Sequence, residues 1–184
     1  MSVFPLVSLE TEDPIVKQVF DRLRQRWGGV LNLYRVLGWA PALSKEWAAF
    51  AWTMRFELEV PRKLRELLVI RIASLVGARY EYVHHLKMAK EAGVTERQIT
   101  HLHAWRSSEL FDETEGLVLQ LADELASLNS ATPDTMARLQ QLFPPRHLVE
   151  LVVTGAFYCG VARVVNSFGI ELEEHWEGLR VRND

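Results

Sequence analysis

The sequence predicts an all-α protein. Apolar residues recur at helical spacing along most of the chain, and no stretch keeps the period-two alternation of a half-buried strand. Residue types that favour helix starts, such as proline after aspartate or threonine, precede several periodic stretches, and glycines follow them. We therefore expect about seven to nine helices in a single domain over residues 1–184, with a central helical hairpin at about 61–93.

Composition and charge restrict the class of protein. Hydrophobic residues make up 48% of the 184 residues and charged residues 24%, as in ordinary soluble globular domains. The formal net charge is −3 and basic residues do not cluster, so we expect no nucleic-acid partner. Residues 148–165 contain Glu150 and Arg163, which makes them too polar for a membrane span. One cysteine, Cys159, and an N-terminus without a signal-peptide pattern predict a cytoplasmic protein with no membrane partner.

Helix signals divide the N-terminal third of the chain. Asp13 and Pro14 have the pattern of a cap followed by a first helical residue, and Gly28 stops that helix. A short helix is expected at 31–37, and Pro41 opens the next one. The residues expected to face inward from this helix are Leu43, Trp47, Phe50, Ala51 and Met54. Two further tryptophans, at positions 39 and 52, could line a pocket near Glu66; we favour core packing, because large apolar residues are usually just buried.

The central hairpin consists of two helices joined at Gly77. Residues 64–76 are apolar almost all round, which is typical of a buried helix. Gly77 ends that helix, since glycine adopts the left-handed cap conformation at low cost. A second helix then runs from about Tyr80 to Ala92 and stops at Gly93.

Later helices follow the same signals. Thr95 and Gln98 have the spacing of a capping box, and Asp112 and Thr132 are expected to cap two further helices. The last long helix is expected at about 147–168, and its small residues would permit close helix contacts: Gly155, Ala156 and Gly160. We expect Trp176, in the charged tail, to anchor that tail on a neighbouring element.

The hairpin also carries the candidate chemistry. At about 100° per residue, Glu81 and His85 share the apolar face of the second helix, whereas His84 lies toward the lysines and is expected to face solvent. Glu66, on the first helix, is expected to approach this pair. Two carboxylates and an imidazole on buried faces suit proton transfer. The alternative interpretation is an ordinary helix ion pair, since Glu and His four residues apart often serve only packing.

The hairpin resembles the signature of the carboxymuconolactone decarboxylase family, which includes alkylhydroperoxidase D-like proteins. The peroxidase branch has Glu, eleven residues, Cys-x-x-Cys, three residues and His. Glu66 and His85 match that spacing, while Ala78 and Glu81 occupy the two cysteine positions. The run Tyr80-Glu81-Tyr82 is similar to the cysteine-free decarboxylase-like branch, in which Tyr-Glu-Trp is common. The resemblance also covers the Ala-Gly-Val-Thr-Glu-Arg-Gln-Ile that follows and, more loosely, most of the chain.

The resemblance implies an alkylhydroperoxidase D-like helical bundle that acts on a small carboxylated lactone, needs no cofactor and forms homo-oligomers. His85 would donate or accept the proton, Glu81 would be its partner or the direct acid, and Glu66 would orient it. The residues expected to contact the substrate are Arg71 or Arg79, for its carboxylate, and Tyr80 and Tyr82.

Two alternatives stand beside this hypothesis. One is an antioxidant thiol peroxidase, which the sequence disfavours because that chemistry needs a reactive thiol and Cys159 lies in an apolar stripe. The other is a non-catalytic oligomeric protein of the same fold that binds a small molecule. No metal site is expected, because His101 and His103 do not share a helix face and lack ligand spacing.

Overall fold

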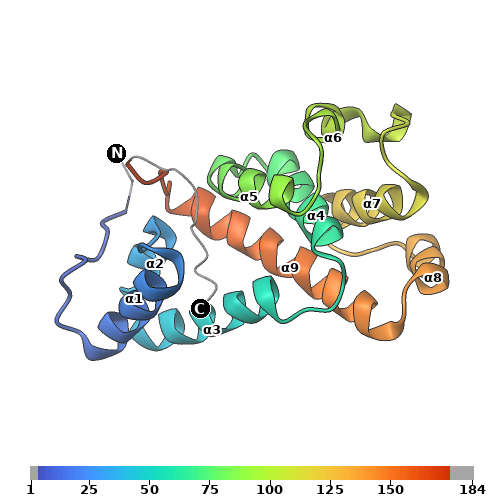
Figure 1. Cartoon of the computed structure of the whole chain (residues 1–184). Helices are drawn as coiled ribbons and strands as arrows, with labels where there is room; N and C mark the ends of the chain where they lie inside the picture. Colours follow the sequence, from blue (N-terminus) through green and yellow to red (C-terminus); the bar gives the residue numbers. More distant parts are fainter. Residues whose placement is uncertain (1–3, 175–184) are drawn as a thin grey trace. The chain divides into compact units, whose positions relative to one another are not determined.

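The computed structural model describes residues 4–174. In that range it contains nine α-helices, one 3-10 helix and no strand (Figure 1), so the all-α prediction is confirmed. Trp176 lies outside the described residues. The elements are α1 (Pro14–Trp27), α2 (Asn32–Leu37), α3 (Pro41–Phe56), α4 (Arg62–Leu75), α5 (Arg79–Glu91), α6 (Glu96–His101), the 3-10 helix η1 (Leu102–Ser107), α7 (Glu113–Ser127), α8 (Pro133–Leu142) and α9 (Pro145–Ser167).

The chain divides into two compact units. One comprises residues 1–58 and 165–184, and the other comprises residues 59–164. The second unit contains α4 to α8 and most of α9, and therefore the whole predicted hairpin. A single domain over 1–184 stays a prediction.

The predicted start and stop residues act as expected. The Asp13 carboxylate accepts hydrogen bonds from the first backbone N–H groups of α1, and Gly77 adopts the left-handed conformation with φ of 65° between α4 and α5. Thr95 and Asp112 each form a capping box at the start of α6 and α7. Because caps satisfy N–H groups that have no partner within the helix, these residues fix the positions at which the helices begin.

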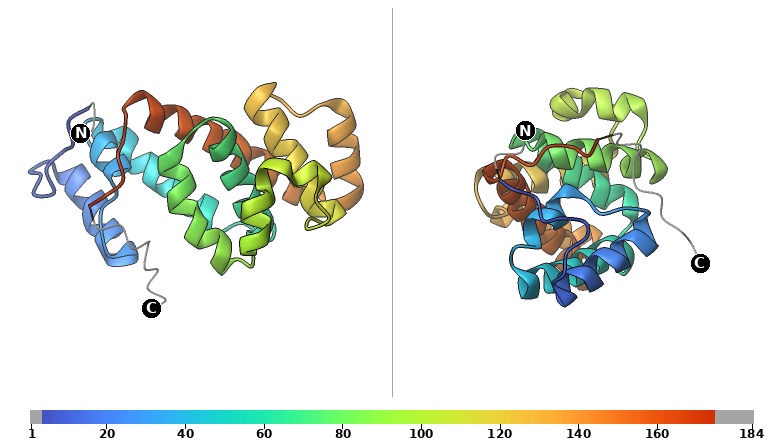
Figure 2. Two further views of the ribbon diagram at one scale, coloured as in Figure 1. Left: turned by 90° about the horizontal axis from the view of Figure 1, so that it is seen from above. Right: turned by 90° about the vertical axis from the view of Figure 1, so that its left-hand side faces the viewer.

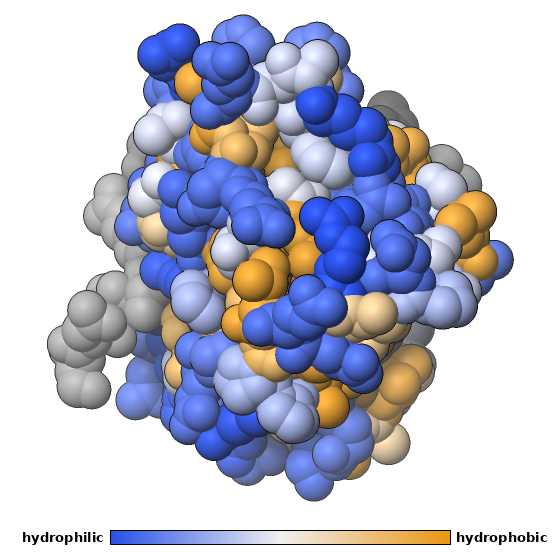
Figure 3. All heavy atoms as spheres, turned by 90° about the vertical axis from the view of Figure 1, so that its right-hand side faces the viewer, coloured by the Kyte–Doolittle hydropathy of each residue, from blue (hydrophilic) through white to orange (hydrophobic). Residues whose placement is uncertain are grey.

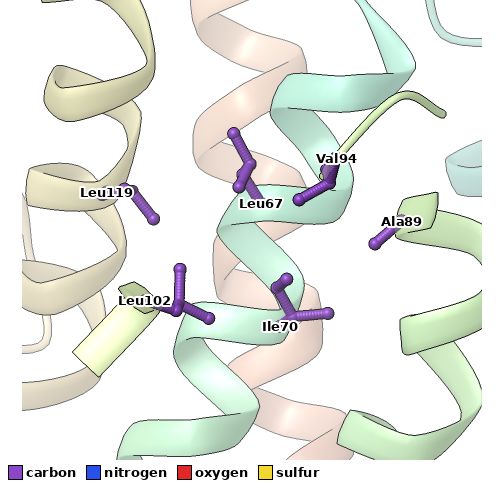
Figure 4. Packing of buried hydrophobic residues seen from close by; sticks show 6 residues of the cluster. All are labelled: Leu67, Ile70, Ala89, Val94, Leu102 and Leu119. Atoms are coloured by element: carbon purple, nitrogen blue, oxygen red, sulfur yellow. The ribbon is translucent and has the colours of Figure 1, made fainter. Parts of the chain in front are cut away.

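Helix α4 is the centre of the second unit. Figure 4 shows Leu67 and Ile70 of α4 between Leu119 of α7 and Ala89 of α5, and Leu102 of η1 joins the same apolar cluster. All five residues are buried, and for Leu67 and Ile70 the apolar character of residues 64–76 predicts it. This packing holds α4 and α5 side by side and so positions their polar side chains.

Helix α9 is seen along its length in the left view of Figure 2 and nearly end-on in the right view, and at Gly155 it lies close to α4 and α7. A Cβ atom at Gly155 would collide with the side chain of Leu125 and contact Leu68 and Ile72. A Cβ atom at Gly160 would meet no atom within 4 Å. Of the small residues expected to permit close contact, Gly155 does so, whereas Gly160 has open space beside it.

The prediction that residues 148–165 are too polar for a membrane span is wrong as far as composition goes: α9 is long and apolar enough to cross a membrane, with a mean hydropathy of 1.7 over an 18-residue window. Core helices of soluble proteins pass the same test, and 56% of that window is buried within the chain. Glu150, inside α9, binds backbone N–H groups of Glu59 and Val60. On the face of the molecule in Figure 3, polar side chains surround small apolar patches. These features fit a helix that packs in the core of the protein.

The prediction of which α3 residues face inward is partly wrong. Ala51 and Met54 are buried, but Leu43 and Phe50 are exposed, and Trp39, just before the helix, is 59% exposed rather than part of the core. Within its unit α3 packs against α1 and α2. These two neighbours cover only a narrow stripe of the helix, which leaves other apolar residues in contact with water.

Candidate active site

Two neighbouring helices bring three ionisable side chains together. Helix α4 carries Glu66, and α5 carries Glu81 and His85 one turn apart. Nδ1 of His85 lies 2.8 Å from Oε2 of Glu66, and Nε2 of His85 lies 3.5 Å from Oε2 of Glu81. The convergence expected from the sequence is therefore observed, and the imidazole lies between two carboxylates.

The three side chains are buried. The exposed fraction is 1% for His85, 4% for Glu81 and 7% for Glu66. A hydrogen bond to the Glu66 carboxylate at Nδ1 fixes the tautomer in which that nitrogen carries the proton. Nε2 has no hydrogen-bond partner in the described chain, so its lone pair is available for proton exchange. The arrangement suits general acid–base chemistry in a nearly dry environment.

Tyr158 and Arg65 adjoin this cluster. The Tyr158 ring, from α9, meets the His85 ring edge-on with 4.7 Å between the ring centres. Burial lowers the pKa of the Arg65 guanidinium, and the nearby Glu66 and Tyr158 oppose that shift. Arg65 donates from Nε to the carbonyl of Val60, 3.2 Å away. The cluster thus combines an imidazole, two carboxylates, a phenol and a fixed cation.

A second cation lies on the solvent side of Glu66. Nε of Arg62 is 3.7 Å from Oε1 of Glu66, and Arg62 also approaches the exposed Glu91 at 3.6 Å. The Arg62 side chain is 40% exposed, so an incoming anion can reach it. Arg62 precedes Glu66 by four residues on the same helix, a spacing that could have indicated this contact from the sequence.

The prediction that His84 faces solvent is wrong. His84 is only 2% exposed, and its ring packs on that of Tyr80 with 4.3 Å between the ring centres. Helix α5 buries a wider sector than one apolar face, because Tyr80 and His84 are covered as well as Glu81 and His85. The lysines that were grouped with His84, Lys87 and Lys90, are exposed as expected.

The residues expected to bind substrate lie in different surroundings. Arg71 is buried, and its Nε forms an ion pair with Asp123 of α7 at 2.6 Å. Its Nη1 donates a hydrogen bond to the carbonyl of Leu102 at 3.1 Å. These contacts join α4 to its neighbours. Arg79 is exposed. Tyr80 is buried beside His84, and Tyr82 packs against the apolar cluster around Leu67 and Ile70.

The cysteine lies in an unreactive environment. Cys159 is buried in α9, and burial raises the pKa of its thiol, although Arg163 nearby acts in the opposite direction. A raised thiol pKa leaves little of the thiolate that reacts with peroxides. Residues 4–174 contain no group of three or more His, Cys, Asp or Glu side chains arranged to hold a metal ion.

The fold and this buried Glu–His–Glu cluster define an all-α protein with a candidate acid–base site in a helical hairpin. Residues 41–124 match the model of the carboxymuconolactone decarboxylase family. Over these residues, which are somewhat less than half of the chain, the sequence is similar to that family. The matched region contains α3 to α6 and most of α7, and thus Glu66, Glu81 and His85.

Similar proteins support the same fold. The uncharacterized protein YdfG of Bacillus subtilis is 28% identical over 96 residues, which cover 51% of this chain and 65% of YdfG, just under two thirds of its length. A complex of the debrominase Bmp8 with 2,3,4-tribromopyrrole has a TM-score of 0.76 at 18% identity, covering 94% of each chain. The AhpD core of a peroxidase-related protein from Ralstonia eutropha has a TM-score of 0.79 at 13% identity, covering 94% of this chain and 93% of its own.

Proposed function

We propose that the chain catalyses cofactor-free proton transfer on a small carboxylated lactone or a related metabolite, by decarboxylation or isomerisation. One observation carries the proposal: His85 is held by Glu66 at Nδ1 while Nε2, beside Glu81, makes no hydrogen bond within the described chain. A histidine oriented in this way can give and take a proton without changing its position.

In the decarboxylation the bond between the ring carbon and the departing carboxylate breaks. Its electron pair passes into the conjugated lactone as an enolate, carbon dioxide leaves, and Nε2 of the protonated His85 delivers a proton to carbon. Glu81 then supplies a proton to Nε2 and regains one from water, and Glu66 stabilises the imidazolium while it exists. Atoms and electrons balance without an oxidant or a metal.

Arg62 is the cation best placed for substrate recognition. Arg62 is partly exposed and its contacts with Glu66 and Glu91 are loose, at 3.7 Å and 3.6 Å, whereas Arg71 is buried in a close ion pair with Asp123 at 2.6 Å. We assign Arg62 to a second carboxylate of the substrate, one that does not react and stays on the product. Tight binding of the departing carboxylate would instead oppose its loss.

The test is turnover of a panel of carboxylated lactones, followed by ultraviolet absorbance and by release of labelled carbon dioxide. His85→Ala and Glu81→Gln should each lose about 10²–10⁴-fold in rate. The control is His103→Ala, an exposed histidine in η1, which should keep full rate. Equal rates in all three variants would overturn the assignment of the site.

The antioxidant alternative has a direct test at the cysteine. If the chain reduced peroxides through its thiol, Cys159→Ser would abolish that reaction; we expect Cys159→Ser to leave turnover intact because the thiol is buried. The non-catalytic alternative predicts a stoichiometric lactone complex, seen by calorimetry, with no product formed.

We further propose that the protein is a cytoplasmic homo-oligomer that binds neither nucleic acid nor membranes. Val149 and Val153 support self-association, because these exposed valines lie one turn apart on α9. Sedimentation at micromolar concentration should show an oligomer, and a monomer at that concentration would contradict this proposal.

A further inference from the structure

A groove of about 590 Å³ lies between α1 and α3. All the residues that line it fall between positions 18 and 57, so it belongs to one compact unit and contains no residue of the Glu–His–Glu cluster. Its volume falls within the range of about 300–1,000 Å³ that is usual for small-ligand sites.

The groove is electropositive although the chain is acidic overall. Arg22 and Arg26 of α1 and Lys45 of α3 line it, against a single carboxylate, that of Glu57. Arg22 and Arg26 are exposed, and the Lys45 ammonium has only a loose contact of 3.6 Å with Glu46. In a chain with a formal net charge of −3, this local excess of positive charge favours an anionic ligand.

The remainder of the groove is apolar and aromatic. Leu23 and Trp27 line it as buried side chains, and Trp52, which is half-buried, lines it beside them. The Arg26 guanidinium stacks over the Trp52 ring at 3.8 Å from its centre. Stacking holds the guanidinium plane in place while its edge stays available for two hydrogen bonds to a carboxylate. A ligand with a flat apolar body and a carboxylate would match both parts of the groove.

Trp27 provides a donor for such a ligand. Its indole N–H is buried and has no hydrogen-bond acceptor among the described residues. Buried donors are normally paired, so a donor without an acceptor beside a groove indicates a missing partner. A ligand oxygen that reaches Nε1 after a small shift of the overlying side chains would supply it.

We propose that the groove between α1 and α3 is a second ligand site, separate from the Glu–His–Glu cluster, which binds a small aromatic carboxylate. The cations Arg22, Arg26 and Lys45 pair with the carboxylate. The ring of the ligand packs over the floor formed by Leu23 and Trp27, beside the Arg26 guanidinium that Trp52 holds in place.

The experiment uses 2-naphthoate as the probe and the full chain labelled with ¹⁵N-tryptophan. The six tryptophans of the chain give separate indole N–H signals, which single Trp→Phe variants assign. Titration with 2-naphthoate should shift the signals of Trp27 and Trp52 saturably, and calorimetry should give the dissociation constant. The uncharged analogue 2-naphthylmethanol should bind at least tenfold more weakly.

Variants test the groove itself. Arg22→Gln combined with Lys45→Gln should weaken 2-naphthoate binding at least tenfold, and Trp52→Leu should do the same. Lys17→Gln is the matched control, because Lys17 is an exposed cation of α1 that pairs with Asp21 and does not line the groove. The affinity of this variant for 2-naphthoate should equal that of the parent. Equal affinity in all variants, shifts confined to other tryptophans, or a double variant that changes only the sedimentation coefficient would overturn the proposal.

Discussion

Nδ1 of His85 lies 2.8 Å from Oε2 of Glu66, a contact that joins two helices across 19 residues of sequence. The contact exists because Gly77 reverses the chain and the apolar side chains of α4 hold α5 alongside it. It determines which nitrogen of the imidazole is left for chemistry, and it therefore leads to the first prediction.

Replacing Glu66 by Gln should impair turnover without much change in KM. The amide of Gln can donate to Nδ1 and so permit the tautomer with the proton on Nε2, the wrong nitrogen for a base. We expect kcat to fall about 10²–10⁴-fold. The measurement is steady-state kinetics on a lactone substrate, with Glu96→Gln, an exposed carboxylate of α6, as the control. A tenfold rise in KM at unchanged kcat would instead assign Glu66 to substrate binding.

Arg62→Gln should raise KM and leave kcat nearly unchanged, because Arg62 is assigned to a substrate carboxylate that does not react. Arg79→Gln, which removes an exposed cation of α5, should alter neither parameter. Steady-state kinetics of both variants separate the two arginines. The opposite pattern would assign the recognition role to Arg79, one of the two arginines, with Arg71, that the sequence indicated.

His84→Ala should destabilise the protein. The side chain is buried against Tyr80, so its removal leaves a cavity that costs about 2 kcal/mol or more in the free energy of unfolding. Urea denaturation followed by circular dichroism measures this change. His103→Ala, at an exposed position, should stay within about 0.5 kcal/mol of the parent. Equal stability of the two variants would mean that His84 is not packed as described.

The Glu150 carboxylate should contribute to the free energy of unfolding at neutral pH but not at acidic pH. Burial alone would raise the pKa of this carboxyl, but hydrogen bonds from the N–H of Val60, from Arg146 and from the N–H of Glu59 outweigh burial and lower the pKa. A carboxyl whose pKa is lower in the folded protein stabilises the fold at any pH above its pKa in the unfolded chain, which is about 4.3 for glutamate. This contribution is lost as the pH falls through the pKa of the folded state.

The corresponding measurement is denaturation of Glu150→Gln between pH 7 and pH 3. Its deficit in unfolding free energy relative to the parent should be constant at neutral pH and should shrink below about pH 4. The control is Glu109→Gln at an exposed position, which should show no such trend. A deficit that stays constant down to pH 3 would exclude the ionised carboxylate as its source.

Two glycines of α9 should respond in opposite directions to alanine. Gly155→Ala places a Cβ atom against Leu125, and overpacking of this kind costs about 1–3 kcal/mol. Gly160→Ala meets no neighbour and should gain up to about 1 kcal/mol from the higher helix propensity of alanine. Thermal unfolding of both variants measures the difference, and a more stable Gly155→Ala would show that Leu125 adapts freely.

The sequence alone determined the fold class, the helix boundaries within a few residues and the grouping of Glu66, Glu81 and His85. These features depend on local signals. Caps such as Asp13 and Asp112 act within one turn, and helical spacing places Glu81 and His85 on one face wherever the helix lies.

The tertiary structure decided the features that depend on what packs against each helix. His84 is buried because α5 is covered over more than one face, and Phe50 is exposed because its unit covers only a narrow stripe of α3. Arg71 is paired with Asp123, 52 residues away, and Tyr158 of α9 lies beside His85. Periodicity gives the direction of a side chain about its own helix axis, whereas burial and pairing depend on neighbours brought in from distant segments.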